Sequence, residues 1–158
     1  LVSLDFLRKV APEGRMVFLK DTCCDYELIR ERLKAVEGTP LKIFNANAQS
    51  WYDSYCHGSA GYNGVMANFH PDLYKWAYDH KDSDPEKAQL VAHFLTTAAM
   101  IEMRAYPVSA KYHQNLVDVP MSLVTRSADA AKLDKNARGE VESLIAMENY
   151  VRKQLGIL

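Results

Sequence analysis

A short apolar run from Met16 to Leu19 ends in Lys20 and is followed by the polar stretch Asp21 to Asp25. Four consecutive apolar residues predict a strand that is buried on both faces, as in a parallel sheet. Parallel sheets keep their ligands at the carboxyl ends of the strands, where Lys20 falls. A buried ammonium is poorly solvated, so the neutral, nucleophilic amine becomes more populated. Lys20 is therefore a candidate catalytic residue; the alternative is a lysine that extends into solvent at the strand end.

Apolar runs and helical patterns alternate over the first half of the chain. Strands are expected at the lysine run, over Leu41 to Ala46 and over Tyr62 to Ala67, and helices around Leu4 to Val10, Tyr26 to Val36, Trp51 to His57 and Pro71 to Tyr78. Ser3 and Asp25 are expected to cap the first two helices. Strand–helix alternation with short connections indicates a parallel sheet covered by helices, so the predicted class is α/β.

The second half of the chain predicts helices only. After a charged connection from Asp79 to Lys87, in which Pro85 fits the first turn of a helix, helical patterns cover Leu90 to Tyr106, Ser109 to Leu116 and Lys135 to Leu155. Three parallel strands on their own would leave both edges of the sheet unpaired. We therefore expect the chain to be the second part of a larger sheet whose first part is absent from this sequence.

Composition excludes several classes of partner. Acidic and basic residues nearly balance at a net charge of −1, so neither nucleic acid nor a membrane is expected as a partner. No apolar run approaches the roughly 20 residues that span a bilayer. Cys23, Cys24 and Cys56 follow neither a disulfide framework nor a metal-ligand spacing. We expect a cytoplasmic protein in a reducing compartment, without a metal or cofactor.

Three segments carry a resemblance to a known family. Val17 to Asp25 looks like the Schiff-base lysine strand of the dihydrodipicolinate synthase and N-acetylneuraminate lyase family. Gly58 to Asn68 is similar to the glycine-rich strand of that family, and Tyr106 to Lys111 resembles its late Asn-Pro-x-x-x-Lys segment. The three segments occur in the family's order and at compatible spacing. The resemblance covers roughly Leu4 to Arg126 and, more loosely, the last helix.

The resemblance implies the C-terminal half of a (β/α)8 TIM barrel. Residues 1–82 would supply strands six to eight, with the lysine strand and the glycine-rich strand, and residues 83–158 would add C-terminal helices to the same domain. The family's catalytic tyrosine and carboxylate-binding turn would lie before Leu1. The missing half of the barrel, or a second chain, is thus an expected partner. A homo-oligomer, dimer or tetramer, is expected as well.

The resemblance also implies the chemistry of a class I lyase or aldolase. Lys20 would form an imine with a pyruvate-type 2-oxo acid, and the derived enamine would add to an aldehyde, or the reverse reaction would cleave a carbon–carbon bond. The matching substrate-binding positions are Thr22, Ala46, Asn47 and Asn63. Ala46 replaces a glycine that is frequent in the family, and Asn63 replaces an isoleucine of the dihydrodipicolinate synthases. Ala48 and Gln49 replace the Asp-Glu pair of sialic acid lyases, which disfavours sialic acid as substrate.

Several alternatives stay open. The substitutions at Ala46, Ala48 and Asn63 favour a non-catalytic member of the barrel family that binds a ligand or acts as a scaffold. Asn45, Asn47 and Gln49 either cap turns or bind a polar aldehyde. Cys23 and Cys24 are better explained as small apolar residues than as reactive thiols. His57 is expected to cap a helix end, and His70 is a weaker candidate for the mouth of the active site.

Overall fold

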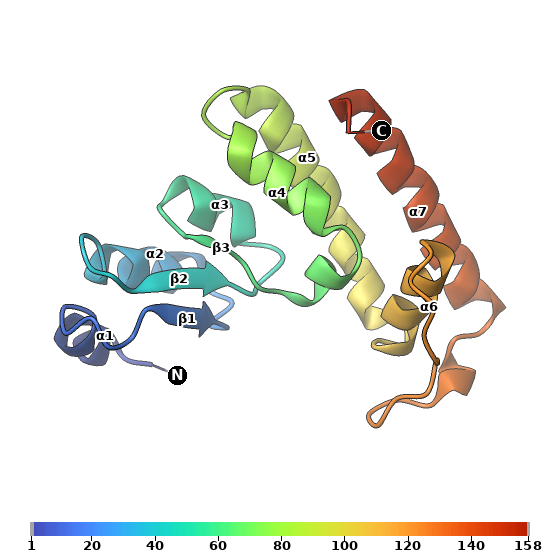
Figure 1. Ribbon diagram of the computed structural model, residues 1–158, viewed down its shortest axis with the longest axis horizontal. Coiled ribbons are helices and arrows are strands. Elements are labelled where there is room, and N and C mark those ends of the chain that lie inside the picture. Colours follow the sequence, from blue (N-terminus) through green and yellow to red (C-terminus); the bar gives the residue numbers. More distant parts are fainter. Residues whose placement is uncertain (1, 158) are drawn as a thin grey trace. The chain divides into compact units, whose positions relative to one another are not determined.

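The computed structural model describes residues 2–157, in which three strand–helix units precede a series of helices (Figure 1). The strands are β1 (Phe18–Asp21), β2 (Lys42–Asn45) and β3 (Gly61–Tyr62). The helices are α1 (Leu4–Val10), α2 (Tyr26–Ala35), α3 (Trp51–Cys56), α4 (Pro71–His80), α5 (Pro85–Ala98), α6 (Val108–Leu116) and α7 (Lys135–Leu155), with 3-10 helices η1 (Val65–Asn68), η2 (Ala99–Met103) and η3 (Ala130–Lys132). The predicted α/β class is confirmed.

Contacts divide the chain into two compact units. The first comprises Leu1–Gly64 and Ala77–Gln89, and the second comprises Val65–Trp76 and Leu90–Leu158. All three strands belong to the first unit, where they form one parallel sheet in the order β1-β2-β3. Lys20 pairs in register with Phe44, and Phe44 pairs with Gly61. The expected parallel sheet is therefore present, and its strands end level with one another.

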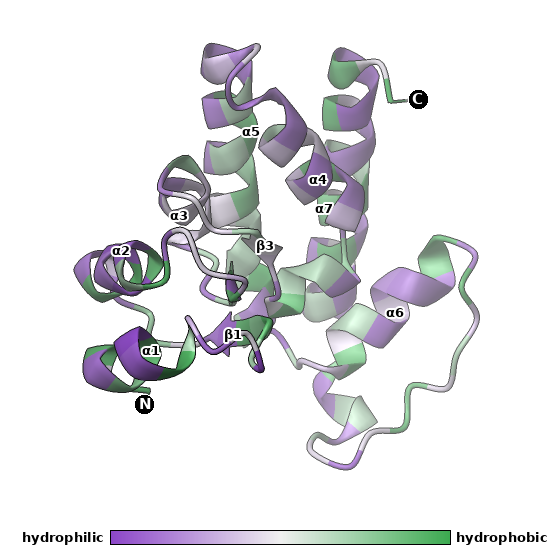
Figure 2. Ribbon diagram, turned by 60° about the vertical axis from the view of Figure 1, so that its left-hand side comes forward, coloured by the Kyte–Doolittle hydropathy of each residue, from purple (hydrophilic) through white to green (hydrophobic). Residues whose placement is uncertain are grey.

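Helices cover one face of this sheet. Figure 2 shows α1, α2 and α3 together on the same side of the strands. The first unit's core contains Leu7, Ala11, Ile29, Leu33, Val36, Leu41 and Ile43, and the partly buried Leu19 packs against it. The two expected caps are confirmed, because Ser3 Oγ accepts a hydrogen bond from the Phe6 N–H at 3.2 Å and Asp25 Oδ1 accepts one from the Leu28 N–H at 2.8 Å.

Strand β1 is not buried on both faces, contrary to the expectation from its apolar run. Val17 is 59% exposed and Phe18 is 49% exposed, and Lys20 is exposed as well. For Phe18 and Lys20 the reason is the alternation of side chains along the strand, whereas Val17 lies before the first residue of β1. Leu19 and Asp21 point toward the helices, so Phe18 and Lys20 lie on the opposite face, which none of the helices of this unit covers. In this chain Lys20 is therefore not the buried lysine that was predicted.

The third strand is also shorter than predicted. Only Gly61 and Tyr62 pair with β2, and Val65–Asn68 forms the 3-10 helix η1 in place of a strand through Ala67. At Gly64 the backbone passes so close to the Tyr62 ring and the Ala46 carbonyl oxygen that a Cβ would overlap both. The chain turns away from the sheet at this crowded glycine.

The helical part follows its local signals closely. The last helix spans Lys135–Leu155 as expected. Helix α5 begins at Pro85, where Asp84 Oδ1 accepts a hydrogen bond from the Lys87 N–H at 3.3 Å, as the proline position predicted. The expected single helix through Tyr106 is wrong, because α5 ends at Ala98 and η2 follows. Within residues 2–157, none of the helices has the length and apolar character to cross a bilayer.

Candidate active site

The carboxyl ends of the three strands form one edge. Asp21, Asn45 and Tyr62 lie side by side in the register of the sheet. The Ala46 N–H donates to the Asp21 carbonyl oxygen at 2.9 Å, and the Asn63 N–H donates to the Asn45 carbonyl oxygen at 2.8 Å. Each strand is therefore followed at the same level by one of the predicted substrate-binding residues, namely Thr22, Ala46 and Asn63.

Lys20 lies on the uncovered face, one position before this edge. The rings of Phe18 and Phe44 are 4.9 Å apart between centroids on this same face. A Cβ on Gly61 would lie only 2.5 Å from the Phe44 ring, so the glycine leaves the space that this ring occupies. Among residues 2–157, the Lys20 ammonium forms neither a hydrogen bond nor an ion pair. Its side chain is thus available to a ligand at the strand ends.

Asp21, the residue directly after Lys20, was not singled out from the sequence. It is 2% exposed, and its Oδ2 lies 2.6 Å from Nη1 of the buried Arg32 in α2. Its Oδ1 accepts a hydrogen bond from the Cys23 N–H at 2.8 Å. Arg32 also donates through Nη2 to the Val2 carbonyl oxygen at 2.6 Å. The end of β1 is therefore attached to α2, to the following turn and to the start of the chain.

The amide side chains after β2 are used mainly to shape the turn. Asn45 is buried, donates to Ser50 Oγ at 3.0 Å and to Ser54 Oγ at 3.2 Å, and accepts from the Asn47 N–H at 2.8 Å. Asn47 accepts from the Ser50 N–H at 2.9 Å and donates to Gln49 Oε1 at 2.7 Å. These bonds support the turn-capping alternative. The substrate-binding role of Asn47 stays a prediction.

Two further candidate side chains, those of Cys23 and His57, have surroundings that favour structural roles. Burial, followed by the hydrogen bond to Asp21, raises the pKa of the Cys23 thiol to about 11. This keeps the thiol protonated and favours its role as a small apolar residue. His57 is exposed, and its Nδ1 lies 2.8 Å from the Asp53 carbonyl oxygen at the end of α3. That contact agrees with the expected capping role.

A buried polar cluster forms in the second unit. Its Glu148, on α7, accepts hydrogen bonds from His70 Nδ1 at 2.7 Å and from His113 Nε2 at 3.0 Å, and none of the three side chains is exposed. Arg152 contacts Glu148 at 3.3 Å and forms a two-pronged ion pair with Asp72 at 2.6 and 3.0 Å. We call these five residues the Glu148 cluster. His70 thus has a partner within its own unit. Within residues 2–157, no group of His, Cys, Asp and Glu side chains is arranged to hold a metal ion.

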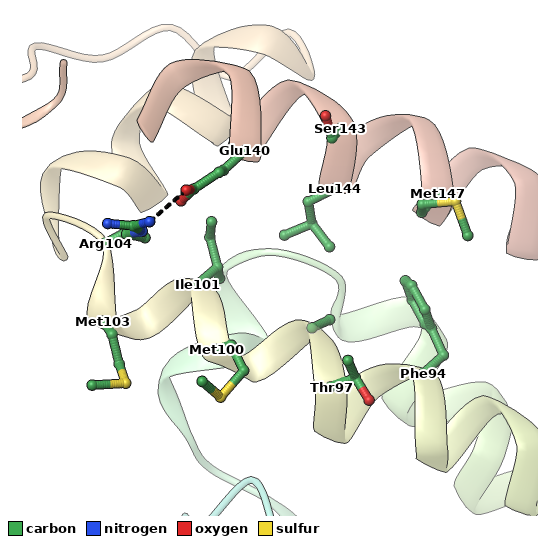
Figure 3. Close-up of a pocket in the computed structure, with 11 residues that line it drawn as sticks. Phe94, Thr97, Met100, Ile101, Met103, Arg104, Glu140, Ser143, Leu144 and Met147 are labelled. Atoms are coloured by element: carbon green, nitrogen blue, oxygen red, sulfur yellow. Dashed lines mark hydrogen bonds and ion pairs between the residues drawn. The ribbon is translucent and has the colours of Figure 1, made fainter. Parts of the chain in front are cut away.

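The second unit also contains an open groove of about 790 Å³. Figure 3 shows Met100 and Met103 on one wall, and Leu144 and Met147 on the other. An ion pair of 2.7 Å between Arg104 and Glu140 lies at one end. The groove contains none of the predicted site residues, and its lining is largely thioether and hydrocarbon. Its chemistry is that of a packing surface rather than of a catalytic centre.

These observations define an α/β protein of parallel strand–helix units with a lysine near the carboxyl end of a strand. No family model and no curated protein matches the sequence, whereas solved structures match it well. Dihydrodipicolinate synthase from Oceanobacillus iheyensis is 17% identical with a TM-score of 0.76, over 94% of this chain and 51% of that chain. The 4-hydroxy-tetrahydrodipicolinate synthase from Methylacidiphilum fumariolicum SolV is 13% identical with a TM-score of 0.79, over 98% of this chain and 51% of that chain.

A prophage protein of the dihydrodipicolinic acid synthase family from E. coli K12, solved in complex with pyruvate, gives 18% identity and a TM-score of 0.79, over 93% of this chain and 51% of that chain. The chain therefore spans about half the length of the structures that it matches. It has the fold of the C-terminal half of dihydrodipicolinate synthase family structures. The resemblance found in the sequence is confirmed at the level of the fold.

Proposed function

We propose that the chain is the C-terminal half of a (β/α)8 barrel, supplying its sixth to eighth strands, and that it belongs to a Schiff-base lyase or aldolase. The observation that carries this proposal is the position of Lys20. It lies on the uncovered face of β1, one residue before the edge at which Thr22, Ala46 and Asn63 are level. Ligand sites in parallel α/β proteins lie at this edge. The fold shared with a pyruvate-bound structure supports the same assignment.

The proposed reaction begins with attack of the neutral Lys20 amine on the keto carbon of a pyruvate-type 2-oxo acid. Loss of water gives an imine, and protonation makes its nitrogen an electron sink. Removal of a proton from the adjacent methyl carbon then gives an enamine. The enamine carbon adds to an aldehyde carbonyl, and hydrolysis of the new imine frees the product and the lysine. In the reverse direction the same steps cleave a carbon–carbon bond.

The sheet requires a partner for this chemistry. Among the described residues, β1 and β3 each pair with β2 alone, so each has one unpaired edge. Unsatisfied backbone groups in apolar surroundings cost on the order of 1–3 kcal/mol each, and Phe18 and Val17 are exposed beside them. We therefore infer that a second set of strands closes the sheet. The term complete protein below means this chain together with that closing half.

Oligomeric state tests this part of the proposal. We expect the isolated chain to aggregate, or to sediment as a closed dimer of two half-barrels, because either state covers the exposed edges. The complete protein is expected to form a homo-oligomer. A stable monomer of the isolated chain, with cooperative unfolding and full activity, would contradict the need for a closing half.

The catalytic assignment is tested by replacing the lysine in the complete protein. Lys20→Ala is expected to abolish turnover of 2-oxo acids with unchanged circular dichroism, because no imine forms without the amine and no large cavity results. Lys20→Arg should fail as well, since guanidinium stays protonated. The matched control is Lys42→Ala, which removes another exposed lysine of the same sheet face. Near-native turnover by Lys20→Ala would exclude the mechanism.

A second candidate function is a non-catalytic barrel that binds a ligand or serves as a scaffold. It is favoured by the side chains after β2, because Ala46 offers no polar group and Asn45 and Asn47 are engaged in internal hydrogen bonds. Such a protein would bind a 2-oxo acid without converting it. Turnover of any 2-oxo acid at ordinary enzymatic rates excludes this candidate.

A further inference from the structure

The residue next to Lys20 in the chain is an acid, and the structure turns it away from the amine. Asp21 points to the helix-covered face, where its carboxylate meets Arg32 at 2.6 Å, and both side chains are almost fully buried. Lys20 points to the other face, because successive side chains of a strand alternate. A carboxylate directly beside a candidate nucleophile is thus paired with a different cation.

This ion pair determines the direction of Lys20. Leu19 packs into the core of the first unit and Asp21 is paired with α2, so both helix-facing positions of the strand end are occupied by fixed side chains. A shift of β1 by one residue would bury the Lys20 ammonium among the helices and expose Asp21. Breaking a buried ion pair in this way is strongly unfavourable. The pair therefore keeps the amine on the face where the ligand is expected.

The pair also determines the electrostatic surroundings of the amine. Only the neutral amine attacks a carbonyl, and an unpaired carboxylate nearby holds a lysine in its charged form. Arg32 neutralises the Asp21 carboxylate, and the Cys23 N–H adds a hydrogen bond at 2.8 Å. Within residues 2–157, Lys20 forms no ion pair with a carboxylate. Among the described residues, Asp21 is thus the carboxylate next to Lys20 in the chain, and it is paired with Arg32.

We propose that Asp21 and Arg32 are positioning residues for Lys20: their ion pair fixes the face on which the amine lies and prevents the adjacent carboxylate from holding it protonated. The proposal rests on the role of Lys20 in the proposed function. Its effect on the reactivity of the Lys20 amine can be measured without any substrate.

Competitive acetylation of the complete protein with acetic anhydride, read by mass spectrometry across pH, measures the reactivity of Lys20 with Lys42 as internal reference. Arg32→Met leaves a lone carboxylate and is expected to raise the pH midpoint of Lys20 acetylation. Asp21→Asn leaves a lone guanidinium and is expected to lower the midpoint. The double variant should return near the wild-type value. The control Arg30→Met breaks a different α2 ion pair, to Asp53, and should leave the midpoint unchanged.

The directions of the midpoint shifts in the two single variants distinguish an electrostatic role of the ion pair from a purely structural one. Unfolding or loosening would move both single variants in the same direction, and that result, or unmoved midpoints, would overturn the proposal. If the midpoints shift in opposite directions but pyruvate and borohydride never modify Lys20, the positioning pair stands and the proposed function falls. If the imine forms but the midpoints do not shift, the positioning pair is wrong and the proposed function stands.

Discussion

Replacing Glu148 by glutamine tests how the C-terminal helices are held together. The carboxylate accepts hydrogen bonds from His70 Nδ1 and His113 Nε2 and lies 3.3 Å from Arg152. Because a carboxylate only accepts, each histidine must carry a hydrogen on the nitrogen that faces it. Glutamine keeps the shape of the side chain but replaces one oxygen by an NH2 group. This group is itself a donor and would face an N–H of His70 or His113. Because each oxygen of Glu148 faces two donors, the side chain would then lose at least one hydrogen bond and all of its charge in a fully buried place.

The size of the effect follows from the protonation of this group. Burial raises the pKa of Glu148, but the hydrogen bonds from His113 and His70 outweigh burial and lower it to about 2 from an ordinary value of 4.5. A folded-state pKa below the unfolded one stabilises the fold above pH 4.5, and the contribution is lost as pH falls toward 2. This pKa difference between the folded and unfolded states contributes about 3 kcal/mol to the free energy of unfolding at pH 6 and roughly 1.5 kcal/mol at pH 3.

Urea unfolding of the complete protein, followed by circular dichroism at pH 6 and pH 3, measures this contribution. Glu148→Gln is expected to lower the free energy of unfolding by about 3 kcal/mol at pH 6, with a smaller loss at pH 3. The matched control is Glu140→Gln on the same helix, whose ion pair with Arg104 is partly exposed; its effect should stay below about 1 kcal/mol. A loss for Glu148→Gln below 1 kcal/mol, or one that does not change with pH, would refute the reasoning.

Two further predictions concern the first unit. Gly61→Ala in the complete protein should lower the free energy of unfolding by about 1–3 kcal/mol, because the new Cβ meets the Phe44 ring; urea unfolding measures it, and an unchanged midpoint would contradict the close packing. Iodoacetamide at pH 8 should modify Cys23, whose pKa is about 11, much more slowly than the exposed Cys24. Peptide mass mapping gives both rates, and equal rates would show that Cys23 is not protected.

Local signals in the sequence were sufficient for most of the elements. Ser3 and Asp25 mark helix starts because their side chains accept hydrogen bonds from nearby backbone N–H groups. The position of Lys20 near a strand end could be read from four apolar residues followed by polar ones. The level ends of the three strands follow from parallel pairing, so the neighbourhood of Thr22, Ala46 and Asn63 was predictable.

Features that depend on distant parts of the chain were not predictable. The apolar run before Lys20 gives no sign that only one face of β1 is covered, because coverage depends on which helices the chain supplies. The Glu148 cluster joins side chains 78 and 35 residues apart, and its histidines have no distinguishing spacing. The pairing of Asp21 with Arg32 spans 11 residues across a turn. No local pattern distinguishes these ionic residues from solvated ones.

The most direct test of the account is to trap the imine. The complete protein is incubated with pyruvate and sodium borohydride, digested, and mapped by mass spectrometry, with Lys20→Ala and Lys42→Ala treated in parallel. We predict that one pyruvate-derived adduct forms on Lys20, persists in Lys42→Ala and is absent from Lys20→Ala. An unmodified Lys20 in a protein that turns over a 2-oxo acid would contradict the assignment of this residue as the Schiff-base lysine.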